Sequence, residues 1–246
     1  MYSATRETNG AIASLNGNLR GVSQSFYSAA DTVTNVLRRL LIEPFEEPLA
    51  RILEHEVVGS CSSLLDIGCG FDSPIKRFSQ RLGRTVGVDL FAPYLVRSRE
   101  VAIHSEYHQT DALEVESKFG PRSFDCVVAV DLIEHLEKPQ GARLLEVMER
   151  VARRKVIVFT PNGFVPQAAY DDNPYQAHRS GWDVGEMRER GYRMWGVHGW
   201  KPLRGERGEP RWKPYRLWAT LALWTQPLVE RRPEHAFHLL CVKDVS

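Results

Sequence analysis

A strand, a tight turn and the start of a helix are predicted by Leu64-Leu65-Asp66-Ile67-Gly68-Cys69-Gly70-Phe71-Asp72-Ser73. The apolar run Ser63 to Ile67 is followed by two glycines and then by a helix expected from Ser73 to Leu82, with Ser73 as its cap and Pro74 in its first turn. Glycine at such a turn permits positive φ angles and lets a ligand approach the backbone closely. Because a tight turn without a ligand would use the same glycines, this motif needs support from the rest of the chain.

Strand and helix patterns alternate after this turn. The expected strands are Thr85 to Asp89, a short one before Asp111, Phe124 to Val130 and Val156 to Phe159, and the expected helices are Pro93 to Ile103 and Pro139 to Arg153. Phe124 to Val130 is nearly all apolar, which is typical of a strand buried on both faces. The alternation predicts an α/β fold with a doubly wound, mostly parallel sheet and helices on both faces.

The chain after Thr160 follows a different pattern. A helix is expected to begin at Asp183, where Glu186 completes a capping box, and to end at Gly191. The remaining expected elements are a strand from Tyr192 to Val197, a helix from Tyr215 to Thr225 and a last strand from Ala236 to Val242. Together these segments predict a seven-stranded sheet with a helical insertion, residues 201–233, before the last strand.

The residues before the first strand are predicted to form an addition to the main domain, which spans residues 61–246. Residues 1–28 are expected to be mobile because they contain too few apolar side chains to offset the entropy of ordering. Residues 29–60 are expected to form two helices, the first from about Asp31 to Ile42 and the second with Leu49, Ile52 and Leu53 on one face. We expect residues 20–58 to pack over the mouth of the ligand site.

The composition fits one α/β domain and excludes several classes of protein. Of the 246 residues, 43% are hydrophobic and 26% are charged, and the formal net charge is +1, a balance that does not indicate binding to a polyanion. The four cysteines form no Cys-x-x-Cys pair, so we expect reduced thiols and neither a disulfide framework nor a zinc site. The polar start lacks the apolar core of a signal peptide, and no apolar run approaches the ~20 residues of a membrane span. We therefore expect a cytoplasmic protein.

Acidic residues follow three of the expected strands. Asp89 ends the second strand, 19 residues after Gly70, where an acid can accept hydrogen bonds from both hydroxyls of a ribose. Asp111 follows the third strand, where an adenine amino group could donate to it, and Asp131 follows the fourth in the segment Asp-Leu-Ile-Glu-His-Leu. All three lie at the carboxyl ends of strands, where open α/β sheets bind their ligands.

Charge distinguishes between two nucleoside ligands. A nicotinamide or flavin dinucleotide would place its diphosphate at the N-terminus of the helix after Gly70. In this chain Asp66 and Asp72 flank the turn, and Ser73 replaces the third glycine of the dinucleotide fingerprint. Two carboxylates disfavour a diphosphate and suit a ligand that bears a sulfonium and an ammonium group, so we expect S-adenosylmethionine.

At these residues the sequence resembles the class I S-adenosylmethionine-dependent methyltransferases, which have a Rossmann-like fold. The resemblance rests on the Asp-x-Gly-x-Gly turn, the acid after the second strand and the Asp-Leu-Ile-Glu-His-Leu segment, and it runs from about Leu64 to Gly196 and resumes at the last strand. It departs from the common pattern at Phe71-Asp72-Ser73-Pro74, where a third small residue is usual. The Gly-Cys-Gly-x-x-Ser-Pro variant is similar to methyltransferases often encoded with bacterial surface-polysaccharide or natural-product genes.

The resemblance implies eight cofactor-binding residues, namely Asp66, Gly68, Gly70, Asp89, Leu90, Asp111, Ala112 and Asp131. The first three would line the methionine moiety, Asp89 would hold the ribose, and Leu90 would lie against the adenine. The next two would bind the adenine edge, and Asp131 would lie beside the sulfur. The residues alone leave a second interpretation open for Asp66 and Asp131, as acids that cap turns.

Three histidines are candidates for the acceptor side of the site. His135 follows the fourth strand close to the expected methyl position, and His178 lies in a loop where relatives carry a similar histidine that faces the acceptor. We treat these two as catalytic candidates, with packing or hydrogen bonding as the alternative for His135 and the anchoring of a turn as the alternative for His178. His198 is expected at the surface or at a strand end. A general base is needed only if the acceptor atom carries a proton.

A metal-dependent enzyme is an alternative that the same residues raise. Glu134, His135 and a later loop histidine resemble the metal cluster of small-RNA 2′-O-methyltransferases, and Thr160-Pro161-Asn162 matches the strand ending of that family. The same motifs occur in many metal-free relatives, Asp131 stands where the first ligand would be a glutamate, and the chain lacks a basic, aromatic track for RNA. We therefore expect no metal and no nucleic-acid partner.

The acceptor is expected to be a small or carrier-linked molecule that is methylated on O or N. Its binding is predicted to involve the long segments Gly163 to Trp182 and Lys201 to Pro233. Trp218 and Trp224 lie in an apolar helix flanked by arginines, which favours a cover over the acceptor, a structural helix or contact with a membrane surface through residues 211–228. A non-catalytic protein that binds S-adenosylmethionine is a further alternative, and the sequence does not indicate the oligomeric state.

Overall fold

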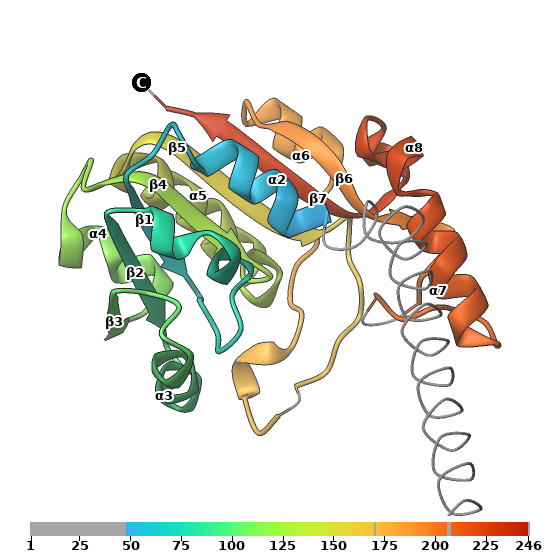
Figure 1. Cartoon of the computed structure of the whole chain (residues 1–246), viewed down its shortest axis with the longest axis horizontal. Helices are drawn as coiled ribbons and strands as arrows, with labels where there is room; N and C mark the ends of the chain where they lie inside the picture. Colours follow the sequence, from blue (N-terminus) through green and yellow to red (C-terminus); the bar gives the residue numbers. More distant parts are fainter. Residues whose placement is uncertain (1–47, 170, 206–207, 246) are drawn as a thin grey trace, which may run out of the picture. The chain divides into compact units, whose positions relative to one another are not determined.

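The computed structural model describes residues 48–169, 171–205 and 208–245, which contain a seven-stranded sheet (Figure 1). The strand order is β3-β2-β1-β4-β5-β7-β6, and β7 is the one strand that pairs antiparallel to both of its neighbours. The strands are β1 (Ser63–Ile67), β2 (Arg84–Asp89), β3 (Glu106–Gln109), β4 (Phe124–Val130), β5 (Ala152–Pro161), β6 (Arg193–Trp200) and β7 (Ala236–Asp244). The sequence-based prediction of a mostly parallel, doubly wound sheet is confirmed.

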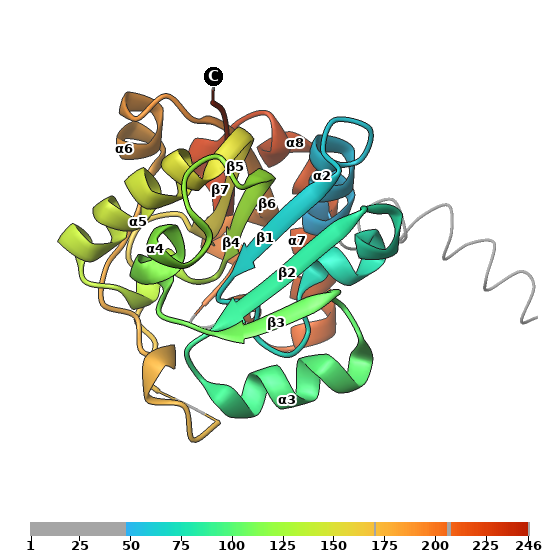
Figure 2. The ribbon, with the colours of Figure 1, turned by 90° about the vertical axis from the view of Figure 1, so that its left-hand side faces the viewer.

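Two apolar layers cover the two faces of the sheet (Figure 2). On one face, side chains of α4 (Val115–Phe119), α5 (Lys138–Val151) and α6 (Val184–Glu189) pack on the inner strands. On the other face, α2 (Pro48–Val57) and the segment that follows β1 cover the sheet. The α3 helix (Ala92–Val101) packs beside β2 and β3. The middle strand β4 therefore has buried side chains on both faces, as its apolar sequence predicts.

The predicted helix from Ser73 to Leu82 is wrong. The segment forms two short 3₁₀ helices, Pro74–Arg77 and Ser79–Arg81. Ser73 caps the first as predicted, since its hydroxyl accepts a hydrogen bond from the amide of Ile75. Phe78 separates the two, with φ −137° and ψ −2°, outside the helical region, and its ring is buried in the core, where it is 1% exposed. Burial of the aromatic ring outweighs the continuity of a helix in this short segment.

The α2 helix confirms the second of the two predicted N-terminal helices. Ile52, Leu53 and Val57 lie in the apolar layer of the sheet, and Glu56 forms ion pairs with Lys155 and Arg193. No residue of α2 lines the cavities at the carboxyl edge of the sheet, so the predicted cover over the ligand site is wrong for residues 48–58. The mobile segment 1–28, the helix from Asp31 to Ile42 and the rest of the proposed cover lie outside the described residues.

The insertion before the last strand is helical, as predicted. It contains α7 (Tyr215–Trp224) and the short α8 (Gln226–Glu230), both of which pack against β6. Gly199 permits this contact, because a Cβ atom there would lie 2.1 Å from the carbonyl oxygen of Ala222. Within the described residues, no helix is both long enough and apolar enough to cross a bilayer.

Candidate functional site

The turn after β1 has the open backbone that its two glycines predict. Gly68 and Gly70 have φ angles of +69° and +56°, a region that side-chain-bearing residues rarely adopt. A Cβ atom on Gly68 would lie 2.8 Å from Cδ1 of Leu132, and one on Gly70 would meet no atom within 4 Å. Gly70 therefore faces open space at the carboxyl edge of the sheet, where a ligand can approach the main chain.

Two adjoining cavities surround this turn, and we call them the glycine-turn cavities. Their volumes are about 260 and 240 Å³, and they share Gly68, Gly70, Tyr94, Asp131 and Gln176 as walls. The structure brings all eight predicted cofactor residues together: the larger cavity is lined by Gly68, Gly70, Asp89, Leu90, Asp111, Ala112 and Asp131, and the smaller by Asp66, Gly68, Gly70 and Asp131. Residues from four strand ends thus meet at one place.

Asp89 lies at the end of β2 with its carboxylate fixed by the backbone. Its two oxygens accept hydrogen bonds from the amides of Gly70, at 2.9 Å, and Phe91, at 2.8 Å. Burial raises the pKa of Asp89, and the hydrogen bonds from these amides oppose that rise. Each oxygen keeps a lone pair for a further donor, so the carboxylate is oriented to accept from the hydroxyls of a ribose.

Asp66 is more deeply placed than its predicted role required. Its side chain is 1% exposed, and one oxygen accepts from the hydroxyl of Ser73 at 2.6 Å and lies 2.9 Å from Nε2 of His104. The other oxygen, Oδ1, is buried without a hydrogen-bond partner. The acid therefore ties the turn to the rest of the fold, which matches the alternative interpretation, while its second oxygen remains able to accept a hydrogen bond. Nothing in the sequence around His104 indicated this contact.

Asp111 and Ala112 form the opposite wall of the larger cavity. Asp111 Oδ1 accepts from the amide of Leu113 at 2.8 Å, which caps the short 3₁₀ helix Ala112–Glu114, and Oδ2 has no hydrogen-bond partner among the described residues. Leu90 is 39% exposed where it faces this space. An apolar side chain and a carboxylate at the same end of the cavity suit the ring and the amino group of an adenine.

Asp131 occupies the boundary between the glycine-turn cavities and a third cavity. It follows β4 with a φ of +47°, and its amide donates to the carbonyl of Phe159 at 3.0 Å. Residues held in this left-handed region cost free energy and are common at functional sites. The side chain of Asp131 is 52% exposed toward the cavities, and its partial desolvation there raises its pKa. Glu134 is 2% exposed, and its burial together with the charge of Asp131 raises its pKa.

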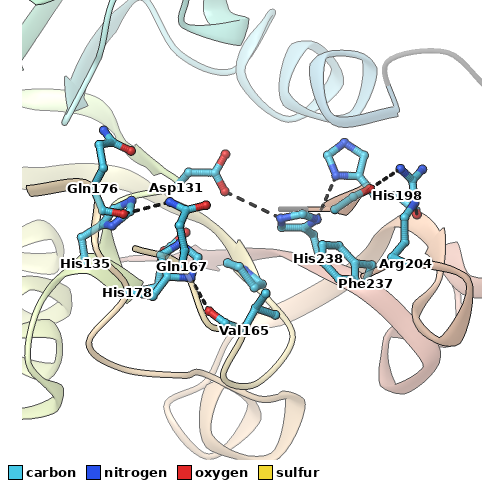
Figure 3. Close-up of a pocket in the computed structure, with 13 residues that line it drawn as sticks. Asp131, His135, Val165, Gln167, Gln176, His178, His198, Arg204, Phe237 and His238 are labelled. Atoms are coloured by element: carbon cyan, nitrogen blue, oxygen red, sulfur yellow. Dashed lines mark hydrogen bonds and ion pairs between the residues drawn. The ribbon is translucent and has the colours of Figure 1, made fainter. Parts of the chain in front are cut away.

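The third cavity, which we call the histidine pocket, has a volume of about 510 Å³ (Figure 3). Four imidazoles line it, from positions far apart in the sequence: His135, His178, His198 and His238. Its other walls are Asp131, Glu134, Pro161, Val165, Gln167, Gln176, Arg204, Gly208 and Phe237. Both segments in which we predicted acceptor contacts contribute to these walls, whereas α7 with its tryptophans does not line the pocket.

The hydrogen bonds of His135 and His178 fix their tautomers. Nδ1 of His135 lies 3.2 Å from the carbonyl of Ala177, and Nδ1 of His178 lies 2.6 Å from the carbonyl of Val165. A carbonyl only accepts, so both Nδ1 atoms carry hydrogen and both Nε2 atoms of the neutral rings have a free lone pair. Burial lowers the pKa of His135 to about 4 and also lowers that of His178. Both rings are therefore neutral at pH 7.

His198 lies near a strand end, as predicted, and His238 was not predicted at all. His198 is close to the end of β6, with a φ of +66° at an irregularity in the pairing of β6 with β7, and its side chain lines the pocket, which the sequence did not indicate. Its Nδ1 is 2.9 Å from Nδ1 of His238, whose Nε2 lies 3.9 Å from the carboxylate of Asp131. One signal could have identified His238: the last strand runs antiparallel, so its first residues lie at the carboxyl edge of the sheet.

Glu134, His135 and His178 also form a group that could hold a metal ion. Their ligand atoms all lie within 4.8 Å of one another. Oε2 of Glu134 accepts from the hydroxyl of Thr160 at 2.9 Å, whereas Oε1 is buried without a hydrogen-bond partner. A carboxylate oxygen and two imidazole lone pairs are suitable ligands for a divalent cation. The sequence raised this grouping, and the fold brings its members together.

Comparisons with known proteins agree with this geometry. Residues 65–160 match the family model of a methyltransferase domain. These residues form a methyltransferase domain, consistent with the class I S-adenosylmethionine-dependent superfamily that the sequence resembles. The matched residues include the glycine turn and three of the acids at the strand ends, so S-adenosylmethionine is the cofactor of this methyltransferase. A search of curated proteins found no match.

Solved structures confirm the fold of the methyltransferase. A S-adenosylmethionine-dependent methyltransferase from Archaeoglobus fulgidus is 14% identical, with a TM-score of 0.53 over 86% of this chain and 99% of that one. One from Mesorhizobium loti is 17% identical, with a TM-score of 0.51 over 83% and 99%. The methyltransferase domain of bacterial CtHen1-CN is 16% identical, with a TM-score of 0.52 over 82% and 100%. At these identities the similarity shows a shared fold.

Proposed function

We propose that this methyltransferase transfers the methyl group to an oxygen or nitrogen atom of a small or carrier-linked acceptor held in the histidine pocket. One observation carries the proposal: the larger glycine-turn cavity and the histidine pocket share Asp131, His135 and Gln176 as walls. A cofactor that fills the glycine-turn cavities then ends beside Asp131, and an acceptor in the next cavity faces it at the same point. Such juxtaposition of the two reactants is the main requirement for this reaction.

The glycine-turn cavities fit the cofactor by their shape and by their unpartnered acceptors. Gly70 opens onto free space, the Asp89 carboxylate is oriented by two amides, and Asp66 Oδ1 is a buried acceptor without a donor. When bound, S-adenosylmethionine supplies a methyl group already activated by its sulfonium, so the protein has to orient the two reactants and exclude water. The carboxylates at the turn would favour the two positive groups of the methionine end.

The histidine pocket would receive the proton of the acceptor. An acceptor hydroxyl, or a neutral amine that carries hydrogen, would use its lone pair to take the methyl group of S-adenosylmethionine, would leave S-adenosylhomocysteine, and would have to lose a proton. The Nε2 lone pairs of His135 and His178 are available for that proton, and so is Asp131, whose raised pKa favours protonation. We assign His178 as the base and His135 as an orienting hydrogen-bond acceptor, because a ring with a pKa of about 4 is a weak base.

A metal-dependent transfer is a second candidate that one observation favours. Glu134 Oε1 is buried and unpartnered beside two imidazole lone pairs, and a divalent cation would satisfy all three. The same oxygen is also satisfied by a proton, which the raised pKa of Glu134 favours, and we therefore keep the metal-free reaction as the proposal. We expect activity to survive exhaustive EDTA treatment. Activity that EDTA abolishes and that magnesium or manganese restores would establish the metal-dependent alternative.

The acceptor assignment is tested by filling the histidine pocket. Val165 is 8% exposed and lines this pocket but neither glycine-turn cavity. Val165→Trp should abolish the release of S-adenosylhomocysteine in a panel of hydroxyl and amine acceptors, and calorimetry should show that the binding of S-adenosylhomocysteine changes less than about twofold. Val96→Trp, at an exposed position on α3, is the matched control. Undiminished turnover by folded Val165→Trp would contradict the proposal.

A further inference from the structure

A fourth cavity continues from the histidine pocket on the side away from the cofactor. Its volume is about 600 Å³, and it shares Val165, Arg204 and Phe237 with the histidine pocket. Three cationic side chains line it, Lys201, Arg204 and Arg211, and we call it the cationic cavity. The glycine-turn cavities, the histidine pocket and the cationic cavity therefore form a continuous series, in which each member shares walls with the next.

Arg204 lines both the histidine pocket, where Figure 3 shows it beside His198, and the cationic cavity. Its guanidinium donates to two carbonyls, from Nε to His198 at 3.0 Å and from Nη1 to Gly208 at 2.6 Å. Among the residues that the structure describes, no acid forms an ion pair with it, and burial lowers its pKa. A partly desolvated guanidinium that meets only neutral carbonyls has an uncompensated charge, which a bound anion would stabilise.

Lys201 is a second partly buried cation in the same cavity. Its Nζ donates to the carbonyl of Asn162, and burial lowers its pKa against the opposing charge of Asp183. It forms no ion pair within the described part of the chain. Among the described residues, the one acid in the cavity wall is Glu234, and this carboxylate is 3.3 Å from Arg188.

Arg211 is brought beside Arg204 by a short antiparallel loop. The amide of Arg211 donates to the carbonyl of Leu203 at 3.0 Å, and the amide of Gly205 donates to that of Glu209 at 2.8 Å. These bonds hold the two ends of the loop together at the bridge between Arg204 and Pro210. The backbone therefore places both arginines in the wall of the cavity, and guanidinium groups bind phosphoryl oxygens through paired N–H donors.

We propose that the cationic cavity binds a phosphoryl group, as a phosphate or a diphosphate, that is part of the methyl acceptor. This inference rests on the proposed function, because it places the reacting atom of the acceptor in the histidine pocket. The described residues place three cationic side chains around a cavity of about 600 Å³. Their positive charge is larger than the single negative charge of a carboxylate and matches that of a phosphate or diphosphate ester. The acceptor is then a phosphorylated or diphosphate-linked alcohol or amine.

A purely structural role for Arg204 makes a different prediction. Its bond to the carbonyl of His198 holds a residue with a φ of +66°, so the arginine also stabilises the pocket wall. If that were its whole function, Arg204→Gln would have a lower melting temperature, and neither wild-type protein nor any variant would bind pyrophosphate. Arg204→Lys keeps the charge and loses the paired geometry, so it should retain part of the anion affinity.

Calorimetry with inorganic pyrophosphate and inorganic phosphate tests the subsite without an acceptor. Wild-type protein should bind pyrophosphate, and Arg204→Gln should weaken that binding by about tenfold or more. Arg211→Gln, an exposed residue whose replacement does not threaten folding, should weaken it severalfold. Arg150→Gln is the matched control, because this arginine pairs with Glu116 outside the cavity. The proposal would be overturned if wild-type protein did not bind pyrophosphate. It would also be overturned if Arg204→Gln and Arg211→Gln both bound pyrophosphate as tightly as wild type.

Turnover distinguishes a phosphoryl group of the acceptor from a free anion. In a panel where each alcohol or amine is offered with and without a phosphoryl group, the phosphorylated member should have the lower KM, and Arg204→Gln should remove the difference. Equal KM values, despite pyrophosphate binding, would overturn the assignment to the acceptor. A failure of the proposed function would give another result. No member of the panel would then be methylated, although Arg204→Gln would still bind pyrophosphate more weakly than wild type.

Discussion

The glycine-turn cavities and the histidine pocket lie side by side, yet they are built from different parts of the chain. The former use the ends of β1, β2, β3 and β4 and the turns that follow them, within residues 66–136, together with Gln140 of α5 and side chains of residues 173–179. The latter joins β4, the loop after β5, the end of β6 and the start of β7. The cofactor side depends on backbone conformation and local turns, whereas the acceptor side depends on contacts between distant segments.

This difference separates what is common to class I methyltransferases from what is specific to this chain. The family match covers residues 65–160, which supply most walls of the glycine-turn cavities. The residues of the histidine pocket from Val165 onward lie beyond the match. We therefore expect substitutions on the two sides to affect different measurements, cofactor affinity on one and turnover on the other.

The largest expected effect is on turnover, from His178→Ala. Loss of a general base lowers the rate about 10² to 10⁴-fold, provided that the acceptor atom carries a proton. The affinity for S-adenosylhomocysteine should stay within about twofold, because His178 does not line the glycine-turn cavities. Single-turnover kinetics and calorimetry measure the two quantities. His55→Ala, at a side chain that is 86% exposed, is the control. A loss of cofactor affinity equal to the loss of rate would break the separation of the two sides.

A smaller effect is expected from Asp89→Ala on the cofactor side. The charged acceptor of the ribose hydroxyls is lost, and so is the acceptor of the Gly70 and Phe91 amides, which together should weaken binding by about 2 to 3 kcal/mol. Calorimetric titration with S-adenosylhomocysteine measures the change. Asp72→Ala is a suitable control, because this exposed acid pairs with Lys76 at the surface. Parent-like affinity of Asp89→Ala would show that the ribose assignment is wrong.

The smallest effect is a change in how stability depends on pH, from His198→Gln. Burial and the nearby Arg204 charge lower the pKa of His198 to about 4, below its usual value of 6.5. Between these values the unfolded chain binds more protons at this residue, so its contribution to the free energy of unfolding falls as the pH drops from about 6.5 toward 4. The slope is at most about 1.4 kcal/mol per pH unit for one group.

Urea unfolding at several pH values between 7 and 5 compares wild-type protein with His198→Gln. The variant should lose less stability on acidification than wild type does. The comparison is needed because Asp131 and Glu134 have raised pKa values and contribute the opposite slope, since the folded protein holds more protons there. Identical slopes in the two proteins would mean that His198 is not buried in the neutral form.

The sequence predicted most of the cofactor side because its signals are local. Gly68 and Gly70 act through their own φ angles, and Asp89, Asp111 and Asp131 follow directly from strand ends that apolar patterns identify. One local prediction was wrong: the 3₁₀ segment after Ser73 depends on how Phe78 packs against the sheet, which no local pattern records.

The acceptor side was predicted only in part, for the same physical reason. His135 and His178 were identified by resemblance, and the two long segments by their length, but the position of His198 in the pocket wall was not predicted and His238 was missed. Both enter the pocket through the pairing of β6 with β7, a contact between residues far apart in the sequence. Arg204 is a candidate for binding a phosphoryl group because no acid among the described residues pairs with it, and the sequence does not show this lack of a partner.

The central claim is that the cofactor and the acceptor meet at Asp131, and a crystal structure with S-adenosylhomocysteine tests it most directly. The ribose should lie at Asp89 and the adenine between Leu90 and Asp111. The sulfur should lie beside Asp131, at the opening into the histidine pocket. A ligand bound elsewhere, or a sulfur that faces away from the histidine pocket, would contradict the account.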